Sequence, residues 1–311
     1  MGDISRRQWL TAAGLGAAGV ATTAGAQGPA SVEDLIRAVK GARVFDLSFA
    51  WTEQSPVLDL NPPYASALNR THKMTHEIFG QAPGSQVSWA SEIMYFSGQH
   101  GSPTLDAIGH IGRNLKLHGG VDAVAATATP GGIGADLGID AFPLDLMLSR
   151  VAFLDVARHV AGGRPDPLPA GFEITAAHLE QTAQAQGVEI RPGDSLLMRT
   201  GWGPYFGKDN ARYLGEQSPG PGQDAARWII GRKIRMAGND TATFEKRPAA
   251  YGKELFSVHM MLLVDNGIYI MENANLEPLG DARTYVALLV TTPLKIRGAT
   301  GSPLRVLALA P

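Results

Sequence analysis

The stretch FSGQHGSPTLDAIGHIG, Phe96 to Gly112, places two of the chain's eight histidines and an aspartate within eleven residues. His100, Asp106 and His110 are all at even positions, so an extended segment would put their side chains on one face. Asp106 and His110 are also four residues apart, so a helical turn would keep that pair together. Two imidazoles and a carboxylate that converge could bind a divalent metal, or could hold a base beside a polarised water. A polar loop whose histidines bond to the backbone is the alternative interpretation.

The composition is that of a soluble globular protein and narrows the possible chemistry. The chain has 311 residues, of which 44% are hydrophobic and 18% charged. Its formal net charge of −2 provides neither a basic surface for nucleic acid nor a polybasic membrane patch. The absence of cysteine excludes disulfides, thiolate metal sites and a cysteine nucleophile. Any metal must therefore be held by His, Asp, Glu or carbonyl oxygen.

The N-terminal segment resembles a twin-arginine export signal. The paired Arg6 and Arg7 precede an aromatic residue and a leucine, and a Gly/Ala-rich run then ends at Ala26. A membrane anchor is the alternative, but the run is too short and too weakly apolar, since a spanning helix needs about 20 apolar residues. We predict a cleaved signal over 1–26, a helix and linker over 27–42, and a periplasmic or secreted protein without stable membrane insertion.

Downstream of residue 31, apolar patterns alternate between the helical and the strand period. Helices are expected over 32–39, 174–190 and 225–234; Ile174 and Thr175 mark the start of the second and Gly187 its end. Strands are expected over 43–51 and 86–97, and also within 143–157, 191–202 and the final segments. A helix, an Asn-Gly turn and a strand are expected over 257–274. The glycines of 131–138 predict a turn, because no apolar strand precedes them as in a phosphate-binding loop.

Two later segments also carry polar side chains that could belong to an active site. His259 and Glu272 flank the predicted helix–turn–strand unit, so both side chains could return to one site. Asn239, Asp240 and Thr241 form a polar cluster at the end of an apolar strand.

With these segments the chain resembles the cyclase family that includes bacterial kynurenine formamidase and isatin hydrolase, whose motif is His-x-Gly-Thr-His-x-Asp-x-Pro-x-His. The motif matches His100 to His110, except that Thr104 stands at its second histidine and Ile108 at its proline. The segments GDSLLMRTGW, GNDTATFE and VHMMLLVDNGIYIMENANLEPL follow in family order. The resemblance extends from about Arg43 to Ala310. It implies one mixed α/β (α+β) domain over 43–311, with a mixed central sheet or partial barrel flanked by helices, in a homo-oligomer.

The resemblance also implies a role for each motif residue. One divalent metal, Zn²⁺ or Mn²⁺, would be held by four side chains, and His110 would act as the acid/base; the four are His100, Asp106, His259 and Glu272. Thr104 cannot replace an imidazole, although its hydroxyl could hold a water or a substrate oxygen. Further candidates for substrate contacts are Trp51, Trp89 and Asp240, and core packing is the alternative for both tryptophans.

These parts imply a metal-dependent hydrolase of an amide or ester bond in a small cyclic or N-acyl (formamide-like) substrate. Water on such a metal has a pKa near 7, and His110 is placed to take a proton and return it to the leaving group. One alternative is a metal-free or non-hydrolytic periplasmic binding protein, whose site lost its metal with the histidine replaced by Thr104. A polyketide-type cyclase is another. No feature of the sequence identifies the substrate.

A second pair of histidines has metal-like spacing without the matching context. His72 and His76 are four residues apart, but the glutamate follows the second histidine, so the metalloprotease pattern is not met. Their surroundings are polar and lack a clear helical period. We predict a surface or lid loop here.

Overall fold

The computed structural model describes residues 31–99, 101–251 and 254–311, with only the backbone of 250 and 251. His100 and the predicted export signal lie outside the described residues. The chain divides into two units, residues 1–41 and residues 42–311. In the first, the helix predicted over 32–39 is present as α1 (Val32–Gly41), and it has no buried residue. None of the helices within the described ranges is long and apolar enough to cross a membrane.

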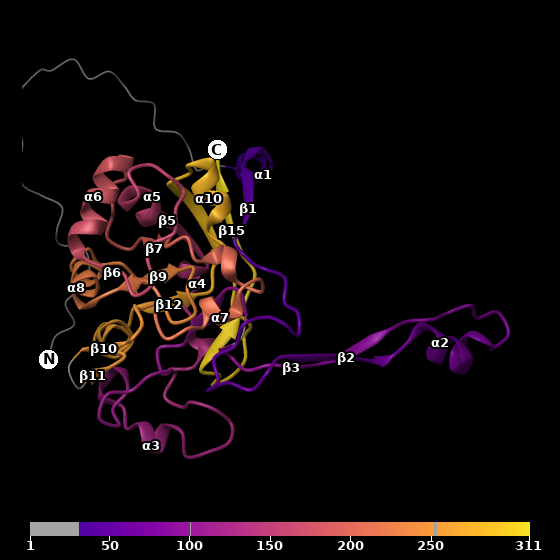
Figure 1. Ribbon diagram of the computed structural model, residues 1–311. Helices are drawn as coiled ribbons and strands as arrows, with labels where there is room; N and C mark the ends of the chain where they lie inside the picture. Colours follow the sequence, from indigo (N-terminus) through magenta and orange to yellow (C-terminus); the bar gives the residue numbers. More distant parts are fainter. Residues whose placement is uncertain (1–30, 100, 252–253) are drawn as a thin grey trace, which may run out of the picture. The chain divides into compact units, whose positions relative to one another are not determined.

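The second unit is built on a mixed nine-stranded sheet with the strand order β1-β15-β13-β5-β7-β9-β12-β4-β14. The four adjacent strands β5, β7, β9 and β12 run parallel to one another, and all other pairings in the sheet are antiparallel. The sheet curls into a half-barrel, so the predicted partial barrel is confirmed (Figure 1). The strand bounds are β1 (Arg43–Asp46), β4 (Thr104–Asp106), β5 (Leu148–Leu154), β7 (Ser195–Met198), β9 (Met236–Asn239), β12 (Tyr269–Glu272), β13 (Val286–Thr291), β14 (Gly301–Pro303) and β15 (Val306–Ala310).

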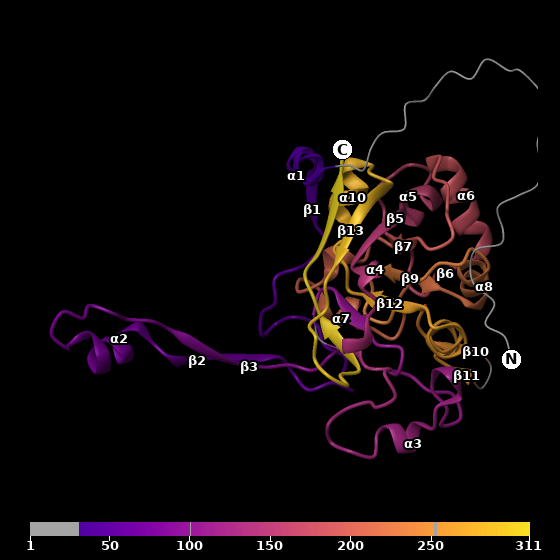
Figure 2. The same cartoon turned by 180° about the vertical axis from the view of Figure 1, so that it is seen from behind.

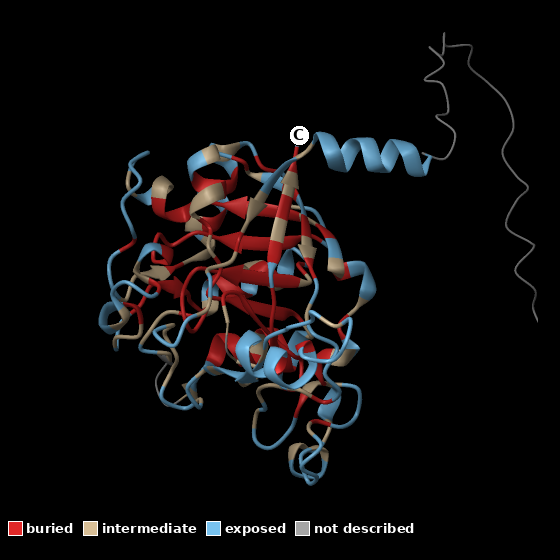
Figure 3. Cartoon of the chain, turned by 90° about the vertical axis from the view of Figure 1, so that its right-hand side faces the viewer, coloured by how far each residue is buried: buried red, intermediate tan, exposed pale blue. Residues whose placement is uncertain are grey.

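Helices cover the parallel half of this sheet. In Figure 1, α5 (Val156–Val160), α6 (Ala176–Gln186) and α8 (Gln223–Gly231) lie together beside β5, β7 and β9. The start predicted at Ile174 is too early, because Ile174 is part of a strand and α6 begins after Thr175, whose hydroxyl caps it. As predicted, α6 ends at Gly187, which has the left-handed conformation. Strands β7, β9 and β12 are buried along their whole length and form the centre of the core (Figure 3).

Shorter elements connect the strands. The remaining α-helices are α2 (His72–Thr75), α3 (Ala123–Ala126), α4 (Leu144–Met147), α7 (Asn210–Tyr213), α9 (Ser257–His259) and α10 (Glu277–Ala282). Single turns of 3-10 or π-helix are η1 (His76–Gly80), η2 (His118–Gly120), η3 (Ile139–Ala141), η4 (Gly203–Tyr205) and η5 (Met260–Val264). Three two-stranded sheets complete the unit: β2 (Ala65–Arg70) with β3 (Ser91–Tyr95), β6 (Glu173–Ile174) with β8 (Gly220–Pro221), and β10 (Ala250–Tyr251) with β11 (Glu254–Leu255).

The strand predicted over 86–97 is present but shorter than predicted. Only β3 is extended and paired, and its one partner is β2, so the two strands form a hairpin arm that projects from the unit (Figure 2). This strand is not part of the core, because Ile93 and Tyr95 are more than half exposed. The helical turns α2 and η1 lie at the tip of the arm. His72 and His76 are exposed there, as predicted for a surface segment, although on helical turns and not in a loop.

Candidate metal centre

Strand β4 carries the central part of the histidine-rich motif into the sheet. Thr104 and Asp106 share one face of this strand, and both are completely buried or nearly so. On the neighbouring β12, Glu272 pairs directly with Thr104, which places its side chain diagonally beside Asp106 on the same face. The turn before β4 is tied to the end of β12, because the hydroxyl of Ser102 donates to the carbonyl oxygen of Asn273 at 2.6 Å.

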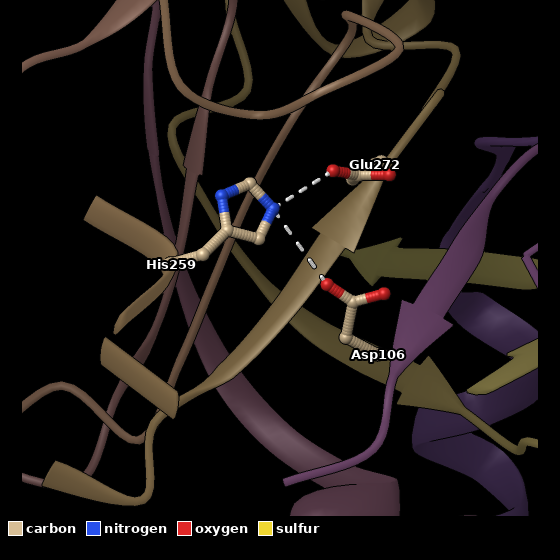
Figure 4. A group of neighbouring side chains, drawn as sticks. All are labelled: Asp106, His259 and Glu272. Atoms are coloured by element: carbon tan, nitrogen blue, oxygen red, sulfur yellow. Dashed lines mark hydrogen bonds and ion pairs between the residues drawn. The ribbon is translucent and has the colours of Figure 1, made fainter. Parts of the chain in front are cut away.

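Three side chains with metal-binding atoms converge at this point. Figure 4 shows the imidazole of His259 directing its Nε2 atom towards both Asp106 and Glu272. This atom lies 3.3 Å from Glu272 Oε1 and 3.8 Å from Asp106 Oδ2. One ligand atom from each of the three residues lies within 4.8 Å of the others. We call Asp106, His259 and Glu272 the candidate metal cluster.

The opposite nitrogen of the same imidazole faces a fourth buried acid. Nδ1 of His259 lies 2.5 Å from Oε1 of Glu245, a completely buried residue that follows β9. The backbone N–H groups of His259 and Val258 also donate to this carboxylate, at 3.2 and 3.3 Å. His259 is therefore clamped between Glu245 on one side and the two other members of the cluster on the other.

The crowding of acids in a buried place shifts their proton affinities. Burial raises the pKa of Asp106 to about 6, although the nearby His110 lowers it and Glu272 raises it further. Burial likewise raises the pKa of Glu272. For His259, burial lowers the pKa, but the hydrogen bonds and charges of Glu245 and Glu272 outweigh burial and raise it to about 10. Without a metal, the His259 ring is thus in its doubly protonated, positively charged form at neutral pH.

The residues present fit a divalent metal. Both carboxylate oxygens of Asp106 are buried and have no hydrogen-bond partner among the described residues. An unpartnered buried carboxylate is strongly unfavourable unless a cation is bound to it. Ligand atoms at about 2 Å from one ion lie roughly 3–4 Å apart, and His259 Nε2 lies at such distances from Asp106 and Glu272. One imidazole and two carboxylates suit Zn²⁺ or Mn²⁺.

A pocket of about 450 Å³ opens beside the cluster. His259 and Glu272 line it, together with His110, the predicted acid/base. Gln99 fixes the His110 ring, because its Nε2 atom lies 3.2 Å from His110 Nδ1 and donates to the carbonyl oxygen of Thr300. Much of the remaining wall is apolar and comes from the segment before the arm and from later loops: Pro56, Val57, Leu58, Leu60, Ile111, Leu214, Ala242 and Phe256.

Two of the predicted substrate contacts lie near the cluster but do not line this pocket. The hydroxyl of Thr104 donates to the carbonyl oxygen of Gly98 at 3.1 Å, so its proton is already used within the protein. Trp51 packs against Gly101, where a Cβ would come within 2.5 Å of the indole ring. Gly101 also has a φ of +126°, so the motif requires glycine there. Trp51 thus supports the motif turn and lines a separate pocket of about 500 Å³ together with Phe96 and Ser102.

The other two predicted contacts have different surroundings. Trp89 lies in the hairpin arm, where its ring packs on Phe79 with centroids 5.0 Å apart. Asp240 is completely buried, and its carboxylate accepts hydrogen bonds from the N–H groups that follow β7, including those of Thr200, Gly201 and Trp202. Its oxygens are satisfied by the backbone. The geometry therefore favours a structural role for Asp240.

Sequence reasoning missed two residues of the site, Glu245 and Gln99. Glu245 lies in the polar segment that begins at Asn239, but its distance from His259 along the chain gives no local signal of contact. Gln99 directly precedes His100, and a glutamine next to a histidine is too common a pattern to indicate a function. Both contacts depend on tertiary packing.

Known proteins resemble this chain in sequence and in fold. The model of the Cyclase family matches residues 45–246. Isatin hydrolase from Roseibium aggregatum is 32% identical over 176 residues, which cover 55% of this chain and 63% of that protein. The alignment thus spans less than two thirds of this relative.

Solved structures share the fold over most of this chain. A crystal structure described as a novel cyclase has a TM-score of 0.76 and 27% identity, over 88% of each chain. Isatin hydrolase A from Ralstonia solanacearum has a TM-score of 0.70 and 22% identity, over 93% of this chain and all of its own. At the lower identity, the second likeness concerns the fold alone.

Proposed function

Because this chain belongs to the cyclase family, we propose that it is a metal-dependent hydrolase of a small cyclic or N-acyl substrate. The convergence of Asp106, His259 and Glu272 beside a pocket is the observation that carries this proposal. The sequence likeness to isatin hydrolase supports the same class of reaction. We also propose a single Zn²⁺ or Mn²⁺ per chain, since Thr104 removes the imidazole that a second metal would need.

The candidate metal cluster would hold the ion, with His100 as a further ligand from the motif. A divalent ion there would polarise a carbonyl group and lower the pKa of a coordinated water to about 7. Glu245 keeps the His259 ring in place, and the buried setting of Asp106 excludes competing water from its oxygens.

His110 would move the proton that hydrolysis requires. Gln99 contacts its Nδ1 atom, so Nε2 is the atom that faces the reaction; Nε2 can take a proton once the Gln99 amide turns its oxygen, in place of its nitrogen, towards a protonated Nδ1. Addition of water to the carbonyl carbon releases a proton, and cleavage of the C–N or C–O bond requires one on the leaving atom. A single imidazole that takes the first proton and supplies the second keeps the two in balance. The apolar wall that includes Val57, Leu58 and Phe256 would hold a compact ring beside these groups.

The name of the relative directs the first assay to isatin, a cyclic amide. The mature protein would be dialysed against a chelator, reloaded with Zn²⁺ or Mn²⁺, and mixed with isatin while its absorbance is followed. We expect ring opening that is lost on chelation and restored by metal. An N-formyl aryl amide and an aryl ester, tested in parallel, separate the bond types. Loaded protein that hydrolyses none of the three would count against the hydrolase.

A metal-free binding protein is the competing function, and Thr104 at the motif's second histidine favours it. The unpartnered oxygens of Asp106 argue in the opposite direction, because a binding protein without metal would keep a costly buried acid. Elemental analysis separates the two functions, since only the hydrolase should contain about one divalent ion per chain.

We further propose twin-arginine export to the periplasm, based on Arg6 and Arg7. Lysine keeps the charge but loses the guanidinium group, so the Arg6→Lys, Arg7→Lys double variant should remain in the cytoplasm as precursor. Unimpaired export of this variant in a fractionation experiment would remove the assignment. The family resemblance also leads us to propose a homo-oligomer, which light scattering of the mature protein tests.

A further inference from the structure

We infer that Glu245 is a positioning residue, which holds His259 in the one ring orientation and tautomer that turns Nε2 towards the metal. The inference rests on the proposed function, because it assigns a role toward the proposed metal. It extends the site to a residue outside the motif, on the loop that follows β9.

The contacts of Glu245 show how this works. Its carboxylate can only accept hydrogen bonds, so the close contact at 2.5 Å requires the proton to be on Nδ1 of His259. In the neutral ring this leaves the lone pair on Nε2, the atom that faces Asp106 and Glu272. Ligand histidines commonly bond to a carboxylate through the nitrogen that does not bind the metal.

The surroundings keep the ring from turning over. Phe244 and Phe256 stand edge-on to the imidazole, with centroid distances of 6.3 and 5.8 Å. Oε1 of Glu245 also accepts from the backbone N–H of His259, while Oε2 accepts from that of Val258. The same carboxylate thus fixes both the start of α9 and the ring of the ligand that α9 presents. A shift of either would move Nε2 away from the cluster.

The test separates positioning from mere stabilisation of the fold. Glu245→Gln has nearly the same shape and can still accept from His259, but it loses the charge and one acceptor oxygen. The matched control is Asp194→Asn, which removes another buried carboxylate, one that accepts from the backbone N–H of Arg191 away from the candidate metal cluster. Zn²⁺ affinity of each folded variant would be measured by competition with a chromogenic chelator.

We expect Glu245→Gln to weaken Zn²⁺ binding about 10–100-fold, and Asp194→Asn to change it by no more than about twofold. Equal affinities of wild type and Glu245→Gln would overturn the role of Glu245 while leaving the hydrolase intact. If wild type bound no Zn²⁺, both proposals would fail.

A second measurement on the wild type does not depend on the variant's folding. Nitrogen-15 NMR of the Zn²⁺-loaded protein should show His259 with a proton on Nδ1, at a strongly downfield shift, and with Nε2 bound to the metal. A proton on Nε2 in that spectrum would overturn the inference. Recovery of affinity in Glu245→Asp relative to Glu245→Ala would add support, since the shorter side chain keeps the charge.

Discussion

Two groups of buried or half-buried acids lie at the same edge of the central sheet, and they differ in which groups contact their carboxylate oxygens. In the first, Asp155 and Glu277 surround Arg199, and each of their carboxylate oxygens accepts from an arginine side chain at 2.8–3.0 Å. In the second, the candidate metal cluster, neither oxygen of Asp106 has a hydrogen-bond partner among the described residues, and the ion pair of Oδ2 with His259 Nε2 is as long as 3.8 Å. We call the first group, Asp155, Arg199 and Glu277, the arginine cluster.

The difference shows how a structural acid can be told from a binding acid. Both groups stand near the carboxyl ends of parallel strands, so position alone does not distinguish them. The arginine cluster carries its own cation and is complete. The candidate metal cluster has an excess of acceptors over donors, which a bound cation would correct.

The largest effect on stability is expected where the arginine cluster loses its cation. Arg199→Met removes one partner from the buried Asp155 and the partner of the half-buried Glu277, and should lower the free energy of unfolding by about 3–5 kcal/mol. Urea unfolding at pH 7 measures it. Arg305→Met is the matched control, because the ion pair of Arg305 with Asp46 is largely exposed. This variant should lower the free energy of unfolding by less than about 1 kcal/mol. Equal effects of the two would remove the contrast between the clusters.

An effect of similar size, but on rate, is expected at the pocket beside the candidate metal cluster. His110→Ala should lower turnover by a factor on the order of 10²–10⁴ while metal content stays near wild type. Assay of metal and rate on one sample distinguishes the roles, since loss of metal would make His110 a ligand. Retained metal with unchanged turnover, on a substrate that wild type hydrolyses, would make it a structural histidine.

The smallest expected effect is the number of protons released when metal binds, and it concerns the candidate metal cluster alone. Because the pKa of metal-free His259 is raised to about 10, the ring is protonated at pH 8, and a metal can bind only if that proton leaves. Asp106, with a pKa of about 6, is already ionised at that pH. Calorimetry in two buffers of different ionisation enthalpy should show about one proton released per Zn²⁺. No release at pH 8 would mean that His259 is not a ligand.

The sequence predicted most of the second cluster and none of the first. Asp106, His259 and Glu272 belong to recognisable segments, and the structure brings them together, whereas Arg199 and Glu277 lie in segments with no local sign of ion pairing. The fold class was also readable, and so was the end of α6, because Gly187 acts through local backbone chemistry.

What the sequence could not give depends on partners far away in the chain. The alternating pattern of 86–97 predicts a strand but not its neighbour, so the hairpin arm was not foreseen. Asp240 resembles a site residue in sequence, yet backbone N–H groups that follow β7 satisfy its carboxylate. Glu245 meets His259 only because the loop after β9 folds against α9.

The most direct test of the difference between the clusters is the divalent metal content of the mature protein, purified without chelator, for wild type and Asp106→Asn. We expect about one Zn²⁺ or Mn²⁺ per wild-type chain and less than about a tenth of that in the variant. The metal-free variant should unfold at no lower urea concentration than metal-free wild type, because burial disfavours the charge that Asp106 carries. Wild type without metal, or a variant that binds as much as wild type, would contradict the assignment of Asp106, His259 and Glu272 as a metal centre.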